Sequence, residues 1–282
     1  MACAGRIRFD TRVQQTLHHR HKDCDERQPR SIGWAVTTMR IFDCILFNQE
    51  HDMLECRLSE LGDVVDKMII VESSTTFMGQ PKPHGIDLDR FYKWRDKIHY
   101  ETFEPNPHQL GWAAEHAQRN HLFVALQEFA PEADDIVTVA DCDEIWNPAD
   151  IDILKEGWRV YLMKRLVMSA YWRLSDEHTM VAGPYGQRAG GAQHLRSNRE
   201  RLPNLRSGWH VSWMGGPEWA ANKMRSFSHQ ELMVDDPEGF MAENYRIGRS
   251  IRGEQLIEVQ MDDSWIPWIR EGKAPLSWYR RR

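Results

Sequence analysis

Three carboxylates that directly follow a short apolar run are the clearest chemical signal in this chain. The run covers residues 136–140, and Asp141, Asp143 and Glu144 come after it. Small and β-branched residues in a row predict a strand buried on both faces, and open α/β sheets bind their ligands where such strands end. Carboxylate oxygens at this spacing suit a hard divalent cation. The pattern therefore predicts a metal site that holds a phosphorylated substrate.

A purely structural explanation of the same residues stays open at this point. Aspartates are common in turns, where their side chains accept from backbone N–H groups, and a single D-x-D is a weak pattern. The metal hypothesis therefore depends on what the remaining chain supplies.

The composition is that of an ordinary globular protein with an acidic balance. The chain has 282 residues, of which 41% are hydrophobic and 28% charged, and its formal net charge is −6. This length allows one large domain or two small ones with a sizeable core. General nucleic-acid binding needs basic surface to displace counterions, so the acidic balance argues against a nucleic-acid partner.

Cysteine usage and the apolar pattern set the expected compartment. The five cysteines include no C-x-x-C pair, which indicates reduced thiols rather than a zinc knuckle or a disulfide framework. No run of about 18 apolar residues occurs, and the first forty residues lack the apolar stretch of a signal peptide. We therefore expect a cytoplasmic protein without a transmembrane segment. The sequence does not indicate an oligomeric state.

The elements that must position the carboxylates alternate between strand and helix. Apolar runs predict strands at 41–47, 64–71 and 97–103 ahead of the 136–140 strand, and helical spacing occurs between them at 53–61 and 112–129. This alternation predicts an α/β protein with a mostly parallel, doubly wound sheet. The second half is less regular: residues 158–169 predict a long strand, and the Gly- and Arg-rich stretch 183–207 predicts a mobile loop.

Seven strings in order between about residue 40 and residue 232 together resemble glycosyltransferase family 17. They are Phe42-Asp43-Cys44 through Asn48-x-Glu50 and Leu54-Glu55-x-Arg57-Leu58; Val65-Asp66 through Val71-Glu72-Ser73; Thr76-Phe77-x-Gly79-x-Pro81-Lys82-Pro83; Gln118-Arg119-Asn120; Asp141-x-Asp143-Glu144-Ile145; Ser207-Gly208-Trp209-His210-x-Ser212; and Ser226-Phe227-x-His229-x-Glu231. One such string is weak evidence, but seven in family order are specific. The departures are a front segment that the family pattern does not require and Gln49, where an acidic or small polar residue is expected.

The resemblance implies an A-type glycosyltransferase fold and transfer of N-acetylglucosamine, with inversion, from UDP-N-acetylglucosamine to a glycan acceptor. Residues 1–38 are rich in Arg and His without periodicity, so we expect a disordered or appended segment there. Residues 39–282 are expected to form one domain, with a nucleotide-sugar-binding half at 39–145 and an acceptor-side half at 146–282. Because no anchor or signal peptide is seen, we expect a surface polysaccharide or a lipid-linked precursor as acceptor rather than a secretory N-glycan.

The resemblance also assigns metal ligands. Transfer breaks a bond to a diphosphate, and a divalent ion stabilises the negative charge that builds up there. We expect Asp143 and Asp141 as ligands, with His229 as an additional ligand, since A-type enzymes often take one from a late loop. A hydrogen-bonded structural role for His229 is equally consistent. A late imidazole favours Mn²⁺ over Mg²⁺, although carboxylates alone suit both ions.

Inversion further requires a base that removes the proton of the acceptor hydroxyl. We expect Glu218 in this role, with Trp219 beside it stacking on the acceptor sugar, and Glu231 as the alternative. An exposed loop glutamate without a catalytic role fits the pattern at position 218 equally well.

Substrate contacts are expected at the exits of the early strands and in the later strings. The expected residues are Asn48, Glu50 and Glu72 for the nucleoside, Arg119 and Lys82 for the diphosphate, and Trp209 and His210 for the sugar pocket, where a core role fits the last two as well. Glu144 is expected to orient the metal ligands or to bind sugar hydroxyls.

Two other classes of protein fit parts of the pattern. Haloacid-dehalogenase-type phosphatases also place D-x-D after an apolar strand, but Ile145 stands where they usually carry Thr or Val, and no later G-D-x-x-x-D occurs. A non-catalytic carbohydrate-binding protein with a decayed metal site is the second alternative. Intact Asp141 and Asp143 argue against it.

Overall fold

The structure is a computed structural model, and it describes residues 38–280. The expectation that residues 1–38 are disordered or appended lies, apart from Thr38, outside these residues. Within them the α/β class expected from the sequence is confirmed.

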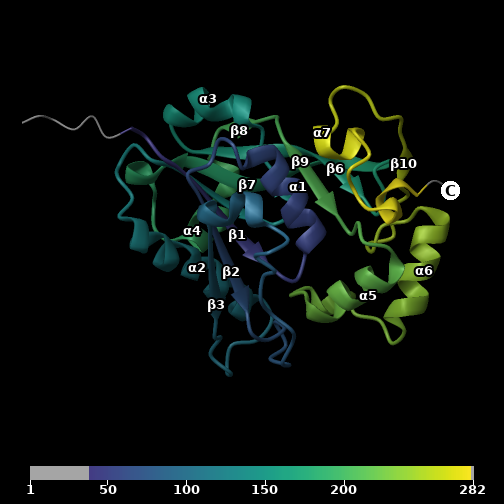
Figure 1. Cartoon of the computed structure of the whole chain (residues 1–282). Coiled ribbons are helices and arrows are strands. Elements are labelled where there is room, and N and C mark those ends of the chain that lie inside the picture. Colours follow the sequence, from purple (N-terminus) through teal and green to yellow (C-terminus); the bar gives the residue numbers. More distant parts are fainter. Residues whose placement is uncertain (1–37, 281–282) are drawn as a thin grey trace, which may run out of the picture. The chain divides into compact units, whose positions relative to one another are not determined.

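The first four strands form the parallel part of one ten-stranded sheet. They are β1 (Ile41–Phe47), β2 (Lys67–Ser73), β3 (Ile98–Phe103) and β4 (Ile136–Asp141), in the spatial order β3-β2-β1-β4. Every neighbouring pair among them is parallel, as the alternation of strands and helices predicts. Their carboxyl ends therefore lie at one edge of the sheet (Figure 1).

The rest of the sheet is mixed in direction, and its central strand was not expected from the sequence. The strand β7 (Trp172–Pro184) pairs antiparallel with β4, and the order continues β7-β6-β9-β5. The other strands are β5 (Glu144–Ile145), β6 (Arg159–Val167), β8 (Asn204–Leu205), β9 (Trp209–Ser212) and β10 (Ile257–Glu258). The strand β6 confirms the long strand expected at 158–169.

Helices cover both faces of the parallel strands because alternate residues of β1 point to opposite sides. Ile45 packs in the same core cluster as Leu54 of α1 (His51–Leu61), whereas Cys44 packs with Leu122 of α2 (Trp112–Leu126). The remaining helices are α3 (Ile151–Lys155), α4 (Ala192–Ser197), α5 (Pro217–Ser226), α6 (Pro237–Ile247) and α7 (Pro267–Arg270) (Figure 1). Single 3₁₀ segments cover Tyr92–Lys97, Gln127–Phe129, Pro148–Asp150, Tyr185–Gln187, Arg199–Arg201, Gln230–Leu232 and Leu276–Tyr279.

The prediction of a mobile loop over residues 183–207 is wrong. This stretch contains the end of β7, the helix α4, two 3₁₀ segments and the strand β8. Its Arg196 is only 7% exposed, because its guanidinium pairs with Asp141 and Glu144 of the acidic turn. The arginines that suggested a solvated loop therefore include one that packs α4 against the turn.

Candidate active site

A fully buried ion pair holds the backbone of the acidic turn. Arg57 of α1 donates from Nε and Nη2 to the two carboxylate oxygens of Asp43 on β1, each at 2.6 Å, and both side chains are 0% exposed. The third nitrogen, Nη1, donates to the carbonyl of Glu144 at 2.5 Å and, at 3.4 Å, to those of Asp141 and Cys142. One guanidinium thus fixes the turn to the first strand and helix.

Glu144 supports the turn from within. Its Oε2 accepts from the backbone N–H of Asp141 at 2.8 Å, and its two oxygens accept from Arg196 at 2.7 and 3.0 Å. The side chain is 3% exposed and does not line the cavity described next. This position fits the orienting role expected for Glu144, and the alternative contact with sugar hydroxyls stays a prediction.

A cavity of about 270 Å³ opens at the carboxyl ends of β1 and β4. Eight of the residues expected at the site line it: Asn48, Glu50, Lys82, Arg119, Asp141, Asp143, His210 and His229. The cavity therefore lies where parallel α/β sheets bind their ligands.

Asp141 lies between two arginines. Its Oδ1 accepts from Arg119 at 2.9 Å and its Oδ2 from Arg196 at 3.2 Å. Burial alone would raise the pKa of Asp141, but the two guanidinium groups outweigh it and hold the pKa well below its ordinary value. Arg119 also donates to Glu115 and Gln193, so both of its terminal nitrogens have protein partners, whereas its buried Nε has none.

Lys223 of α5 joins the exits of two strands, and the sequence analysis did not identify it. Its Nζ lies 2.6 Å from Oε1 of Glu50 after β1 and 3.0 Å from Oδ2 of Asp143 after β4. Burial would lower the pKa of Lys223, but these two carboxylates raise it well above its ordinary value. The ammonium also lies 5.6 Å from the ring centre of Trp213 and 5.3 Å from that of Trp219.

His210 connects Asp143 to a second acid on β7. Its Nε2 lies 3.7 Å from Oδ1 of Asp143, and its Nδ1 lies 3.3 Å from Oε2 of Glu177. Burial would lower the pKa of His210, but these carboxylates raise it above its ordinary value. Burial would likewise raise the pKa of Glu177, yet His210 and Arg165 lower it to about 2. The cavity wall is thus a chain of alternating charges.

Comparison with known sequences identifies the family to which this site belongs. The sequence profile of glycosyltransferase family 17 matches residues 9–261. The chain belongs to glycosyltransferase family 17. The β-1,4-mannosyl-glycoprotein 4-β-N-acetylglucosaminyltransferases of Rattus norvegicus, Homo sapiens and Mus musculus are each 28% identical to it over 222 residues. These alignments cover 64% of this chain and 41% of each relative, so the chain spans about two fifths of their length.

Family membership confirms the resemblance on which the sequence analysis relied. A chain of glycosyltransferase family 17 is a glycosyltransferase, so the phosphatase and the non-catalytic binding protein are both set aside. The match begins at residue 9 and thus includes most of the front segment that was set apart from the family pattern.

The expected cytoplasmic location is wrong. The family 17 relatives are by name enzymes of mannosyl glycoproteins, which overturns that assignment. The preference for a polysaccharide or lipid-linked acceptor rested on the same reasoning and stays an untested prediction. Within residues 38–280, no helix combines the length and the apolar character that a bilayer crossing requires.

The three metal ligands expected in this family 17 site are not assembled. His229 lies 2.5 Å from Oε1 of Glu231 through its Nδ1, and its Nε2 lies 3.3 Å from Arg252. Asp141 and Asp143 do share the cavity, and carboxylate oxygens are the donor type that Mn²⁺ or Mg²⁺ takes. The two acids therefore fit a divalent ion by their chemistry, whereas both ring nitrogens of His229 have protein partners, Glu231 and Arg252.

A separate group of candidate metal ligands lies away from the cavity. Among residues 38–280, the group of three whose ligand atoms all lie within 4.8 Å of one another is His99, Glu101 and Glu128. These residues belong to β3 and to the 3₁₀ segment after α2, and none of them lines the cavity.

Two further predicted substrate contacts have structural partners instead. Glu72 is fully buried and accepts from the backbone N–H of Gln49 at 3.0 Å, from Lys82 at 2.9 Å and from Tyr100 at 2.9 Å. Trp209 donates its indole N–H to the carbonyl of Ser264 at 2.9 Å and does not line the cavity. Glu72 does not line the cavity either, whereas its partner Lys82 does.

The structure does not bring either predicted base into the cavity. Glu218 lies exposed in the first turn of α5, and the side chain of Glu231 is 59% exposed beside His229. Neither lines the cavity. The assignment of either residue as the base stays a prediction.

Proposed function

We propose that this chain transfers N-acetylglucosamine from UDP-N-acetylglucosamine to a hydroxyl group of a glycan, with inversion, on an A-type glycosyltransferase fold. The family and the name of its relatives support the sugar and the acceptor class. The parallel order β3-β2-β1-β4, with an acidic turn directly after β4, supports the fold. The observation that carries the proposal is the meeting of Asp141, Asp143, Glu50 and Lys223 in one cavity at the strand ends.

The chemistry requires positive charge beside the leaving diphosphate. Breaking the bond between the anomeric carbon and the diphosphate leaves the electron pair on a phosphate oxygen, and cations fixed there lower the barrier. Lys223 lines the cavity between two acids. Arg252 also lines it and forms no ion pair with a carboxylate among the described residues. These two side chains bind and neutralise the diphosphate.

A divalent ion, either Mn²⁺ or Mg²⁺, belongs to the proposal. Family 17 membership makes such a dependence an expectation, and Asp143 and Asp141 would hold the ion. When bound, it would supply Lewis-acid stabilisation of the diphosphate charge. The guanidinium groups of Arg119 and Arg196 keep Asp141 ionised, which is the state that binds metal.

Product analysis with a panel of donors tests the proposal. The chain is incubated with Mn²⁺, one nucleotide sugar at a time, and either methyl β-mannoside or a mannosyl glycopeptide, and the released nucleoside diphosphate is measured. We expect release from UDP-N-acetylglucosamine with a β-linked product, since inversion converts an α-linked donor into a β-glycoside. Phosphate release from a phosphomonoester, without turnover of any nucleotide sugar, would contradict the proposal.

A further inference from the structure

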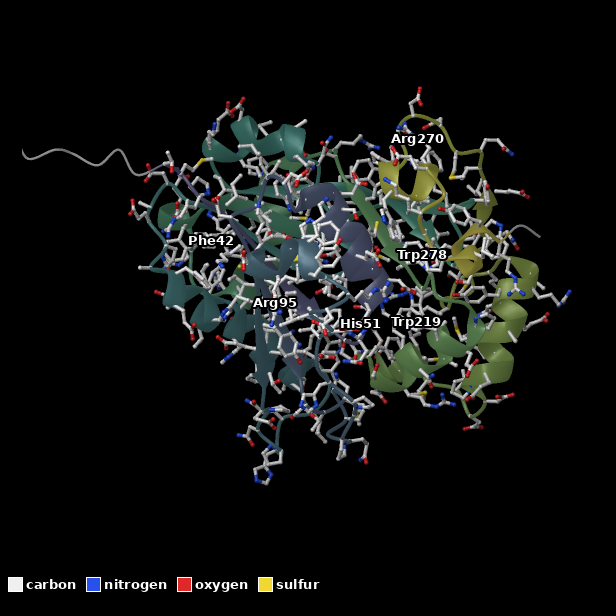
Figure 2. The ribbon with its side chains drawn as sticks, in the orientation of Figure 1. Phe42, His51, Arg95, Trp219, Arg270 and Trp278 are labelled. Carbon is white, nitrogen blue, oxygen red and sulfur yellow. The ribbon has the colours of Figure 1, made fainter. Side chains whose placement is uncertain are left out.

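A second pocket of about 250 Å³ lies on the other side of Glu50. Its apolar wall includes Met214, Trp219 and Trp278, and its polar rim includes His51, Asp52 and Arg90. Figure 2 labels His51, Trp219 and Trp278, which come from α1, α5 and the C-terminal 3₁₀ segment. Within residues 38–280, Glu50 is the only residue that lines both this pocket and the larger cavity.

We propose that this second pocket, the acceptor pocket, binds the acceptor sugar and that Glu50 is the base that activates its hydroxyl group. The inference rests on the proposed transferase function and adds to it the acceptor site and the base. A base for a single displacement has to touch the acceptor and face the donor at once. Glu50 meets this requirement because it stands between the two pockets.

The two carboxylate oxygens of Glu50 have different surroundings. Oε1 accepts from Lys223 at 2.6 Å, and no group among the described residues donates to Oε2. In the reaction Oε2 takes the proton of the acceptor hydroxyl, and the hydroxyl oxygen bonds to the anomeric carbon. The bond from that carbon to the diphosphate oxygen breaks, and its electron pair leaves with UDP. Lys223 meanwhile stays beside the carboxyl group of Glu50 and, in the proposed arrangement, beside the negative charge that develops on the diphosphate.

The backbone before Glu50 is held in an unusual conformation. Gln49 has φ of 58°, in the left-handed region that non-glycine residues seldom adopt. Its backbone N–H donates to Glu72 at 3.0 Å, and its side-chain amide donates to Glu72 and to the carbonyl of Gly85. Backbone strain held in this way is characteristic of functional sites, and here it fixes where Glu50 points.

Burial brings the pKa of Glu50 close to the value that suits a base at neutral pH. The residue is 8% exposed, and burial raises its pKa to about 7, although the Lys223 ammonium lowers it and the carboxylates of Asp143 and Asp141 raise it. A base is most effective when its pKa lies near the working pH.

The acceptor pocket has the lining that a sugar ring requires. Apolar and aromatic faces bind the C–H faces of a sugar, while a few polar groups at the rim orient its hydroxyls. The glycine at position 215 makes room for the indole of Trp219, because a Cβ there would lie 2.5 Å from its Cγ. Trp219 therefore lies against the Gly215 turn as part of the pocket wall.

Replacement of Glu50 by glutamine tests the base. In Glu50→Gln we expect kcat with the mannosyl glycopeptide to fall by about 10²–10⁴-fold, while the Kd for UDP-N-acetylglucosamine changes less than about threefold. We expect kcat/KM of the wild-type protein to rise as the pH increases through about 7, because Glu50 loses its proton there. We expect this rise with pH to be absent in the variant. Lys223→Met is the matched variant for the ion pair, because it breaks the same contact and keeps the rise with pH, moved to higher pH since Lys223 lowers the pKa of Glu50. Unchanged kcat in Glu50→Gln, or an equal collapse in Glu218→Gln alone, would overturn the assignment.

Replacement of Trp219 tests the acceptor pocket by a binding measurement. We expect Trp219→Ala to weaken binding of the mannosyl glycopeptide by at least about tenfold, and Trp219→Phe to keep most of the binding. Saturation-transfer NMR measures the binding. Tyr92→Ala is the surface control, since this tyrosine is 79% exposed and lines neither pocket. Equal binding in Trp219→Ala and the wild type, or no binding by either, would overturn the acceptor pocket.

The two tests separate this inference from the proposed function. Glycopeptide binding that depends on Trp219, without turnover of any nucleotide sugar, would leave the acceptor pocket standing and contradict the transferase and Glu50 as its base. Turnover that persists in Glu50→Gln would leave the transferase standing and contradict the base.

Discussion

The ammonium group of Lys223 lies 2.6 Å from Oε1 of Glu50, although the two residues are 173 positions apart in the sequence. The helix α5 supplies the lysine, and the turn between β1 and α1 supplies the glutamate. The same ammonium reaches Asp143 at 3.0 Å. One cation therefore ties the exits of β1 and β4 to the later half of the chain, at the point where the donor diphosphate is proposed to bind.

Removal of the Lys223 ammonium should lower the rate of transfer more than the affinity for the donor. In Lys223→Met we expect kcat to fall by about 10²–10³-fold, because a fixed positive charge is lost where the transition state gains negative charge. Steady-state kinetics with UDP-N-acetylglucosamine measures the change. Lys223→Arg keeps the charge and serves as the control. An increase in the donor KM with an unchanged kcat would show that the lysine only binds the ground state.

The raised pKa of Glu50 also predicts how stability depends on pH. A carboxyl group whose pKa rises on folding, here from 4.5 to about 7, keeps its proton in the folded state over a range where the unfolded chain has lost it. Its contribution to stability is therefore present below pH 4.5 and is lost as the pH rises through about 7. Urea unfolding from pH 5 to 7 should show a steeper loss of stability for the wild type than for Glu50→Gln. Parallel curves would contradict the raised pKa.

The early strands are predictable because each is signalled by its own residues. The residues of β1 are all buried and belong to two core clusters, one with α1 and one with α2. Their apolar run predicts a strand without knowledge of the strands that pair with it. The strand β7 is different, since its centre, Ser175–His178, is polar and interrupts the apolar pattern. It becomes a strand through its pairing with β4 and β6, which only the folded chain brings together.

The same distinction explains which site residues could be predicted. Asp141, Asp143, Asn48 and Glu50 follow strands directly, so their position in the sequence places them at the sheet edge. Lys223 lies within a helix and looks like any surface lysine, and it becomes a site residue only because α5 packs over the cavity. Glu72, Glu144 and Trp209 have protein partners for their polar atoms, which the sequence alone does not show, and substrate contacts by them stay predictions.

The buried pair of Arg57 and Asp43 should be the most sensitive point for stability. Arg57→Met leaves the Asp43 carboxylate buried without its cation, so we expect a loss of about 3–5 kcal/mol in the free energy of unfolding. Arg90→Met is the matched control, because Arg90 pairs with Asp52 and Glu55 at the surface and such pairs contribute about 1 kcal/mol or less.

Urea unfolding of both variants measures this difference. Thr138 and Trp146 still donate to Asp43, which limits the loss but does not replace the guanidinium. Equal stability of the two variants would contradict this prediction.

Chelation should separate the contribution of a divalent ion from that of the cationic side chains. We expect EDTA to lower transfer and either Mn²⁺ or Mg²⁺ to restore it, because Asp141 and Asp143 present carboxylates to the cavity and carboxylates suit both ions. Asp143→Asn should weaken Mn²⁺ binding measured by electron paramagnetic resonance, whereas Glu128→Gln, in the separate group at β3, should not affect transfer. Full activity in EDTA, with no Mn²⁺ signal that depends on Asp143, would mean that Lys223 and Arg252 carry the leaving-group charge without a metal.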